Sequence, residues 1–294
     1  MNCRFCDCSS LEPDRIELFE LNGDLVESVL MVCKECGGSF LSSFPTAEEL
    51  EEFYDSIGGA ALNGASSPEA IYNQYESAEE KYPNTKVDAK RLVGFYVENA
   101  GKPDKNAKIL DFGAGLGEIA TVFRESYGVT IDNFEKSTVC QQVIRLRGGR
   151  VVEKADLLNP KNRPYDGIFL SQVLEHIPPN APMLRMVLSR LSPKGFVIVA
   201  VPNHAGIYKL LRLRFNNCPP EHLLYFTPRS LAMFMHNRFA LECISWSTVT
   251  RVPVVSRFMK GRLCGILERF NSLAFSPIDI MRKGLYLNAV FKKG

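Results

Sequence analysis

The stretch that decides the fold is KILDFGAGLGE at residues 108–118, where a short apolar run leads into three closely spaced glycines. We expect a strand over 108–110, a tight turn through the glycines, and a helix over 118–126. Glycine lets the backbone turn sharply and approach a ligand closely, and the N-terminus of the next helix offers unpaired N–H groups. The turn therefore predicts a site for a nucleotide-type cofactor.

The spacing of these glycines disfavours a dinucleotide cofactor. The NAD-binding turn follows the pattern G-x-G-x-x-G, whereas this chain has G-A-G-L-G with Asp111 at the start of the run. A second strand, expected over 129–135, ends in carboxylates that can accept both hydroxyls of a ribose. Spacing beyond Gly117 favours Glu135 over Asp132 for this role. The alternative that both are solvated charges at a strand end stays open.

From this point the chain resembles the class I S-adenosylmethionine-dependent methyltransferases. KADL at 154–157 resembles the acidic segment that contacts adenine, YDGIFLSQVLEH at 165–176 resembles the fourth strand and its loop, and LSPKG at 191–195 resembles the turn before the fifth strand. The resemblance implies an α/β fold with a doubly wound, Rossmann-like, seven-stranded sheet and S-adenosyl-L-methionine as cofactor. The cofactor-binding residues expected from the turn and the resemblance are Asp111, Gly113, Ala114, Gly115, Gly117, Glu135, Asp156, Leu157, Ser171 and Gln172.

Five of the nine cysteines lie near the N-terminus in two groups, Cys3-x-x-Cys6-x-Cys8 and Cys33-x-x-Cys36. Candidate hairpin strands over 16–21 and 26–32 separate the groups. Paired cysteines on a hairpin are typical of a zinc ribbon, in which four thiolates close the coordination shell and leave no open position for chemistry. We expect a structural zinc ion on Cys3, Cys6, Cys33 and Cys36. Cys8 is then a bystander or an alternate ligand, and unrelated buried thiols are the alternative.

The charge of this ribbon disfavours a role in reading RNA. Its eight acidic side chains outnumber its three basic ones, whereas nucleic-acid binding depends on neutralising phosphates with Lys and Arg. The ribbon is better suited to shaping the substrate entrance or to a subunit contact, which leaves a homodimer open.

Two further segments narrow the resemblance: FPTAEELEEFY at 44–54 and PEHLLYFTPRSL at 220–231. With the ribbon, they look like the zinc-ribbon methyltransferases of bacterial carbohydrate pathways, including enzymes that methylate carbon or oxygen of nucleotide-linked sugars. The resemblance implies methyl transfer to a carbohydrate, as a nucleotide-linked sugar or glycan, or to a related small molecule. An imidazole titrates near neutrality, so we expect His222 to be a general base oriented by Glu221. A histidine hydrogen-bonded within a packed loop is the alternative.

The chain divides into three expected parts: a zinc ribbon at 1–43, a linker with lid helices at 44–83, and a class I methyltransferase domain at 84–294. Thr46 and Glu49 predict a helix start by mutual capping. His176 and His204 are weaker acceptor-site candidates than His222, and His236 is expected to be structural.

Composition is that of an ordinary enzyme, with a net charge of +2 over 294 residues. No signal segment is recognisable, and no apolar run approaches the roughly 20 residues that span a bilayer. Cysteines without a signal segment indicate a reducing, cytoplasmic location. A basic amphipathic helix expected over 254–273 packs on the domain, or contacts a membrane surface or an anionic substrate. An RNA methyltransferase with a ribbon reader and a non-catalytic scaffold are the alternative functions.

Overall fold

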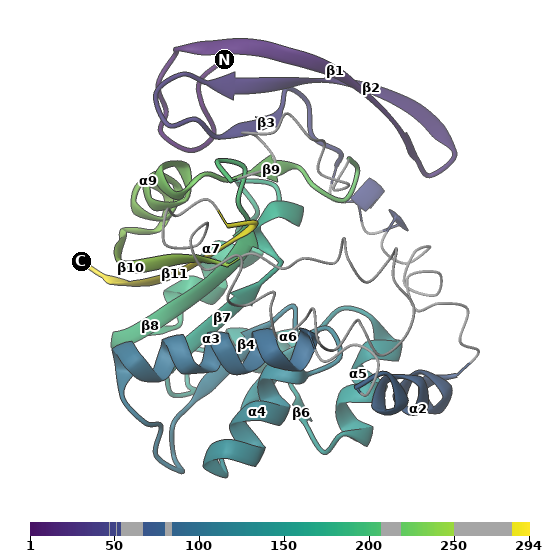
Figure 1. Cartoon of the computed structure of the whole chain (residues 1–294), viewed down its shortest axis with the longest axis vertical. Coiled ribbons are helices and arrows are strands. Elements are labelled where there is room, and N and C mark those ends of the chain that lie inside the picture. Colours follow the sequence, from purple (N-terminus) through teal and green to yellow (C-terminus); the bar gives the residue numbers. More distant parts are fainter. Residues whose placement is uncertain (47, 51, 54–66, 80–83, 207–218, 250–283) are drawn as a thin grey trace, which may run out of the picture.

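The computed structural model describes residues 1–46, 48–50, 52–53, 67–79, 84–206, 219–249 and 284–294. Figure 1 shows two parts, an antiparallel sheet at the top and an α/β body below it. The basic helix expected over 254–273 lies outside the described residues. So do two of the nine cysteines, Cys218 and Cys264, and residues 54–66 of the linker.

The body is built on a seven-stranded sheet with the order β10-β11-β8-β7-β4-β5-β6. Its strands are β4 (Ile109–Phe112), β5 (Asp132–Phe134), β6 (Arg150–Val151), β7 (Tyr165–Ser171), β8 (Leu191–Pro202), β10 (Leu241–Val249) and β11 (Tyr286–Lys293). The strands from β6 to β8 pair in parallel, and β11 is antiparallel to both of its neighbours. This arrangement confirms the predicted fold class.

Two strand boundaries differ from the sequence prediction. β5 covers Asp132–Phe134 rather than 129–135, so Glu135 directly follows its carboxyl end. The expected turn at 191–195 is part of β8, because Tyr165 pairs with Leu191 and the next pair joins Gly167 to Phe196. The extra residues form an irregularity in the strand instead of a separate turn.

Helices cover both faces of the sheet (Figure 1). They are α2 (Pro68–Glu79), α3 (Asn84–Ala100), α4 (Glu118–Tyr127), α5 (Thr138–Leu146), α6 (Lys154–Leu158), α7 (Pro182–Ser189) and α9 (Pro228–Phe239), with a 3-10 turn, η1 (Leu174–His176). Helices α3 and α4 bury an apolar stripe against one face, where the rings of Tyr96, Phe123 and Phe169 meet. Leu170, the next residue of β7, points into the core on the other face because side chains alternate along a strand.

The N-terminal sheet contains β1 (Leu11–Leu21), β2 (Asp24–Cys33), β3 (Ser39–Leu41) and β9 (Leu224–Tyr225). Asn22 and Gly23 join β1 to β2 with φ values of 53° and 90°, as a two-residue hairpin turn requires. The predicted hairpin is confirmed, with longer strands than expected. β9 comes from the body of the chain and pairs with β3, so the ribbon's sheet is completed by a distant segment.

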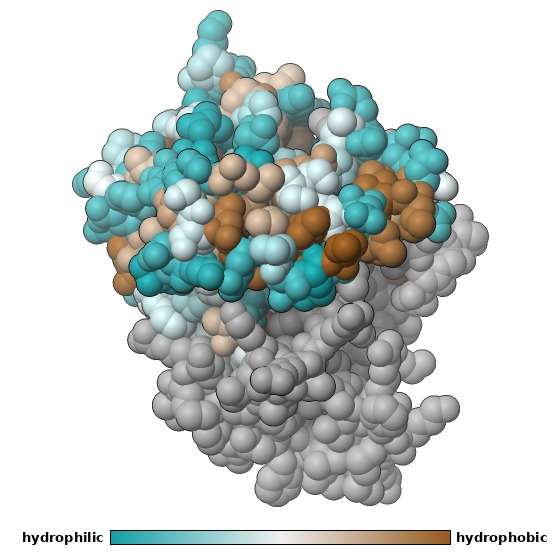
Figure 2. Space-filling view, turned by 90° about the horizontal axis from the view of Figure 1, so that it is seen from above, coloured by the Kyte–Doolittle hydropathy of each residue, from teal (hydrophilic) through white to brown (hydrophobic). Residues whose placement is uncertain are grey.

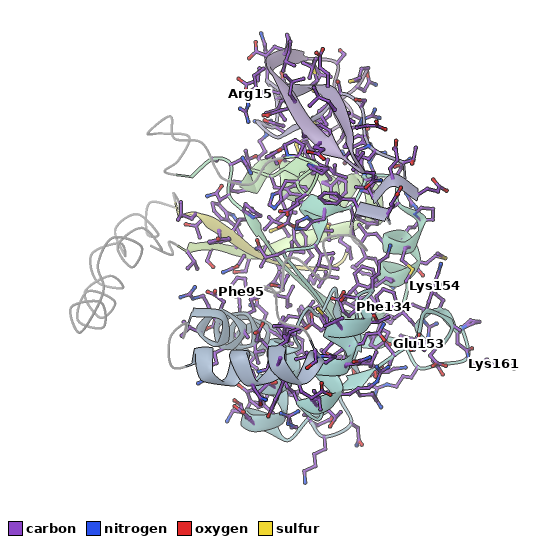
Figure 3. The ribbon with its side chains drawn as sticks, turned by 90° about the vertical axis from the view of Figure 1, so that its right-hand side faces the viewer. Arg15, Phe95, Phe134, Glu153, Lys154 and Lys161 are labelled. Atoms are coloured by element: carbon purple, nitrogen blue, oxygen red, sulfur yellow. The ribbon has the colours of Figure 1, made fainter. Side chains whose placement is uncertain are left out.

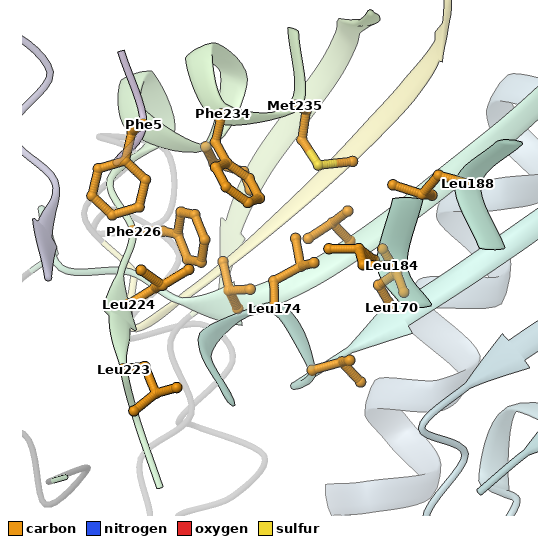
Figure 4. Close-up of a cluster of buried hydrophobic side chains, with 14 of the residues drawn as sticks. Phe5, Leu170, Leu174, Leu184, Leu188, Leu223, Leu224, Phe226, Phe234 and Met235 are labelled. Atoms are coloured by element: carbon orange, nitrogen blue, oxygen red, sulfur yellow. The ribbon is translucent and has the colours of Figure 1, made fainter. Parts of the chain in front are cut away.

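Phe5 anchors the ribbon to the body. Its ring is fully buried and lies 5.2 Å from the ring of Phe226 and 6.1 Å from that of Phe234. Figure 4 shows these side chains in one continuous cluster that reaches Leu184 and Leu188 of α7. The ribbon therefore shares its core with the body.

The surface and the linker add three observations. Figure 2 shows apolar areas among hydrophilic ones on the ribbon side of the molecule.

The predicted capping of Thr46 and Glu49 is confirmed, since each backbone N–H donates to the other's side chain, at 2.7 and 3.1 Å. Within the described part of the chain, no helix is long and apolar enough to cross a membrane.

Candidate active site

The glycine turn lies at the carboxyl end of β4, beside β5. The N–H groups of Gly113 and Ala114 both donate to the carbonyl oxygen of Phe134, at 2.8 and 3.1 Å. Figure 3 shows Phe134 on the same side of the molecule as Glu153 and Lys154, where α6 begins. Ligands of open α/β sheets bind at the carboxyl ends of the parallel strands, so the turn occupies the expected place.

Gly113 and Gly115 differ in the space that the surrounding atoms would leave for a side chain. Gly113 has a φ of +76°, and a Cβ atom there would lie 2.6 Å from Cγ2 of Val173. Gly115 has a φ of +53°, and a Cβ atom there would meet no atom within 4 Å. The turn is thus closed towards Val173 and open at Gly115, which leaves room for a ligand against the backbone.

Asp111 is a buried carboxyl group close to this turn. It is 2% exposed, and its Oδ1 atom has no hydrogen-bond partner among the described residues. Burial, and secondarily the charge of Glu135, raise the pKa of Asp111 to about 7. A positively charged ligand group would stabilise the ionised form, and S-adenosylmethionine carries two such groups, a sulfonium and an ammonium. The site therefore fits the cofactor implied by the resemblance.

Glu135 and Asp132 have different environments. Glu135 accepts hydrogen bonds from the N–H groups of Gly115 and Ser137, at 2.8 and 3.0 Å, at the carboxyl end of β5. Each carboxylate oxygen can accept a second bond, so ribose hydroxyls can still reach it. Asp132 is buried at the opposite end of β5, accepts a bond from the Tyr165 hydroxyl and pairs with Arg150.

The other expected cofactor residues lie around the same edge of the sheet. Asp156 is exposed in the first turn of α6, whereas the side chain of Leu157 is buried and its backbone N–H donates to the carbonyl oxygen of Glu153 at 2.9 Å. Ser171 ends β7, Gln172 follows it, and both line a shallow cavity with Arg91. Gln172 has a φ of +56°, and such strained backbone is often found at functional sites.

Glu175, His176 and His222 form a buried polar cluster next to the turn. Each residue offers one donor atom, and these atoms all lie within 4.8 Å of one another. Glu175 is 0% exposed, and neither of its carboxylate oxygens has a hydrogen-bond partner among the described residues. The cluster abuts the turn through Val173, which precedes Glu175 by two residues and packs on Gly113.

The environment of His222 differs from that expected of a strong general base. Burial, and then the neighbouring His176 and His204, lower the pKa of His222 to about 3. General bases work best when the pKa lies near the operating pH, so His222 in this environment is a weak one. Its neutral ring still offers an acceptor nitrogen. The side chain of Glu221 is exposed, and its carbonyl oxygen accepts a hydrogen bond from His176 at 2.7 Å.

Two other histidines have distinct positions. The ring of His204 stands edge-on to that of Tyr225, with 4.6 Å between centroids, just beyond the end of β8. His236 is exposed on α9, away from the cluster.

The N-terminal cysteines gather as a candidate metal centre. Sulfur atoms of Cys3 and Cys36 are 3.7 Å apart, and those of Cys6 and Cys33 are 3.5 Å apart. Four sulfurs bound to one zinc at about 2.3 Å lie roughly 3.8 Å apart, so the cluster fits a tetrahedral ion. Cys8 lies 3.4 Å from Cys6 and 3.3 Å from Cys33 but is not among the four mutually close thiols. It stays a bystander or an alternate ligand.

Glu175 is the residue of this site that sequence reasoning overlooked as a candidate. In the run Gln172-Val173-Leu174-Glu175-His176 it reads as an ordinary loop charge. A signal was present, because a charged residue flanked by Leu174 and His176 on a short turn after a buried strand is positioned to face the site. Its complete burial depends on residues 221–223, which are distant in the sequence.

One protein family matches this chain over more than half of its length. A family profile described as a methyltransferase domain matches residues 75–242, more than half of the chain. No curated protein gives a significant match.

Solved structures match at low sequence identity. A SAM-dependent methyltransferase from Archaeoglobus fulgidus has a TM-score of 0.50 and 17% identity, covering 74% of this chain and 99% of that one. The [4+2]-cyclase SpnF has a TM-score of 0.50 and 15% identity, with coverage of 85% and 97%. The Burkholderia thailandensis 1,6-didemethyltoxoflavin-N1-methyltransferase has a TM-score of 0.47 and 14% identity, with coverage of 94% and 99%. At these identities, the similarity concerns the fold.

Proposed function

We propose, from the premise that this chain belongs to the methyltransferase-domain family, that it methylates a hydroxyl-bearing small molecule of the carbohydrate class. Membership of this family makes the chain an S-adenosylmethionine-dependent methyltransferase, and the proposal concerns the molecule that accepts the methyl group. The observation that carries the proposal is the buried polar cluster of Glu175, His176 and His222 beside the glycine turn.

The glycine turn and its neighbours would hold the cofactor. When bound, S-adenosylmethionine supplies an electrophilic methyl group on a positively charged sulfur. We assign Glu135 to the ribose hydroxyls and Asp111 to the cofactor's positive charge, because one is at the carboxyl end of β5 and the other is buried with an unpaired oxygen. Asp156, Leu157, Ser171 and Gln172 complete the proposed cofactor site at the same edge.

The polar cluster would hold the acceptor. A hydroxyl group both donates and accepts, so sugar hydroxyls can satisfy the oxygens of Glu175 and the Nδ1 atom of His222, which has no partner among the described residues. These contacts would aim an acceptor atom along the bond between sulfur and methyl. Positioning of this kind supplies a large share of the rate in group transfer.

A carbohydrate is favoured over RNA by two features. The segment at 220–231 that resembles the carbohydrate-pathway enzymes contains His222, a buried member of the cluster. The ribbon next to it is acidic, which opposes the neutralisation of phosphates that RNA binding needs. We favour a nucleotide-linked sugar within this class.

The four N-terminal cysteines would bind a structural zinc ion. Their sulfur spacing suits a tetrahedral shell, and the hydrogen bond from the Cys36 thiol lowers the pKa of the Cys3 thiol to about 5. Thr227 donates to the carbonyl oxygen of Cys36 at 2.8 Å, so the metal would fix the ribbon next to the segment that carries His222. We assign residues 1–43 to this ribbon, 44–83 to the linker and 84–294 to the methyltransferase domain.

The experiment that tests this function offers radiolabelled methyl on S-adenosylmethionine to nucleotide-linked sugars and, in parallel, to total RNA. Products are identified by mass. The expected result is label in the sugar fraction, with the mass of the sugar raised by about 14 units for each ordinary methyl group transferred. Label in RNA alone would overturn the acceptor class, and the Gly113→Ala variant serves as the cofactor-site control because it crowds Val173.

A further inference from the structure

The polar cluster is assembled from two segments that are distant in the sequence. η1 supplies Glu175 and His176, and the segment before β9 supplies His222. Two hydrogen bonds hold the segments together: Leu223 N–H donates to the carbonyl oxygen of Glu175 at 2.8 Å, and His176 donates to that of Glu221 at 2.7 Å. The cluster is thus fixed by the backbone on both sides.

The hydrogen bond of His176 determines which ring nitrogen carries the proton. A carbonyl oxygen can only accept, so Nδ1 of His176 is the donor to Glu221. In the neutral ring, Nε2 is then the unprotonated nitrogen, which carries the lone pair, and it lies 4.0 Å from Oε1 of Glu175. Metal-binding histidines commonly have this arrangement, in which a backbone carbonyl fixes the tautomer and orients the ring.

A cation would stabilise the carboxylate of Glu175. The residue is 0% exposed, both of its oxygens lack a hydrogen-bond partner among the described residues, and one nitrogen each of His176 and His222 lies within 4.8 Å of it. Burial of an ionised carboxylate without compensation is very costly, so such a group either keeps its proton or is paired with a cation such as a metal ion. Nδ1 of His222, which is 5% exposed, is likewise without a partner in the described part of the chain.

We propose that Glu175, His176 and His222 hold a divalent transition-metal ion whose open coordination position takes an oxygen of the methyl acceptor. Two imidazole nitrogens and one carboxylate oxygen suit zinc and its neighbours better than magnesium or calcium, which prefer oxygen ligands. Three protein ligands with a fourth position free is the pattern of catalytic zinc sites. The side chain of His176 is 25% exposed, so the site is open on one side.

The distances require a small closure on binding. Ligand atoms bound at about 2.0 to 2.2 Å lie roughly 3 to 4 Å apart around one ion, so donor atoms up to 4.8 Å apart move together slightly. Side-chain rotation suffices for this, since the backbone hydrogen bonds fix η1 against residues 221–223. The site is separate in composition from the four-cysteine cluster, which offers only sulfur ligands.

The role of the ion, unlike its binding, rests on the proposed function. With the ion bound, the acceptor oxygen would reach Glu175 and His222 through the ion, in place of direct hydrogen bonds to those side chains. An acceptor hydroxyl bound to a cation loses its proton to water more readily. The oxygen then forms a bond to the methyl carbon, the bond between carbon and sulfur breaks, and the sulfur keeps the electron pair as S-adenosylhomocysteine leaves.

The test titrates Co²⁺ into the full chain after its four-cysteine cluster has been loaded with one zinc ion per chain. Calorimetry gives the number of sites, and visible absorption gives the ligand type. We expect one further ion per chain, with no thiolate-to-cobalt charge-transfer band. Glu175→Gln and His222→Asn should each weaken Co²⁺ binding by at least about tenfold, while His236→Asn, the exposed control on α9, should leave it unchanged.

The outcomes separate the metal site from the methyl-transfer function. Absence of a second ion, or wild-type Co²⁺ affinity in Glu175→Gln, would overturn the metal site even if sugars are methylated. A second ion lost in both cluster variants would establish the site even if no sugar accepts a methyl group. S-adenosylmethionine affinity measured on the same samples shows whether each variant is folded, because Glu175 and His222 are not among the proposed cofactor ligands.

Discussion

Glu135 accepts a hydrogen bond from the backbone N–H of Gly115 over 2.8 Å. The carboxylate at the end of β5 therefore holds the glycine turn that follows β4. One residue thus shapes the turn and offers the remaining capacity of its oxygens to a ribose. This link between the turn and the second strand is the basis of the proposed cofactor site.

Replacing Glu135 by Ala should weaken S-adenosylmethionine binding by at least about tenfold, since a hydrogen bond to a charged group contributes about 1.5 to 3 kcal/mol. The variant loses the bonds to Gly115 and Ser137 and the proposed contacts to the ribose. Isothermal titration calorimetry measures the affinity. Asp132→Asn is the matched control, and it should lower the melting temperature while affinity stays within about threefold. The reverse pattern would favour Asp132 as the ribose ligand.

Gly113→Ala should also weaken cofactor binding by about tenfold or more. The new Cβ atom would lie 2.6 Å from Val173 on a backbone with a φ of +76°, and strain of this kind costs about 1 to 3 kcal/mol. Gly128→Ala provides the control, because Gly128 has a φ of +65° at the far end of α4 and an added Cβ there meets no atom within 4 Å. Equal losses of affinity in the two variants would remove the special role of Gly113.

Asp111 should make stability depend on pH. Its pKa is about 7 in the folded chain and near 3.8 in an unfolded one, so the folded state retains the proton over this interval. Stability from this group is therefore complete below about pH 4 and is lost as the pH rises through 7, by at most about 4 kcal/mol. Urea unfolding at pH 5 and pH 8 should show a larger loss in the wild type than in Asp111→Asn. Equal losses would contradict the buried, protonated state.

The N-terminal cysteines can be tested by metal content. Cys36→Ser should lose zinc and melt at a markedly lower temperature, because structural zinc sites contribute directly to folding. Cys8→Ser should retain one zinc ion, since Cys8 lies outside the four mutually close thiols. Zinc per chain is read by elemental mass spectrometry, with Cys140→Ser on α5 as the control. Loss of zinc in Cys8→Ser would make Cys8 a ligand.

The sequence predicts those parts of the fold that depend on local patterns. The glycines at 113, 115 and 117, the apolar run before them and the paired cysteines each identify a structural unit without help from distant residues. The predicted fold class comes from the resemblance to the class I methyltransferases that the glycine turn and the later motifs carry.

The parts that escape prediction depend on long-range contacts. β9 contains two residues, and it joins the ribbon because Leu224 pairs with Phe40 and Tyr225 pairs with Ser39. Glu175 likewise lies against a distant segment, since the N–H of Leu223 donates to its carbonyl oxygen. The low pKa of His222 arises from packing that no local pattern records, although its position in the run at 220–231 marked it as a candidate.

The most direct test of the account compares turnover with cofactor affinity in His222→Asn, using the nucleotide-linked sugar that the transfer assay selects. In the proposed arrangement the acceptor is held at His222, directly or through the ion, and the cofactor at the glycine turn. The account therefore predicts unchanged S-adenosylmethionine affinity and turnover reduced by at least about tenfold. Wild-type turnover in this variant would contradict the placement of the acceptor at the polar cluster.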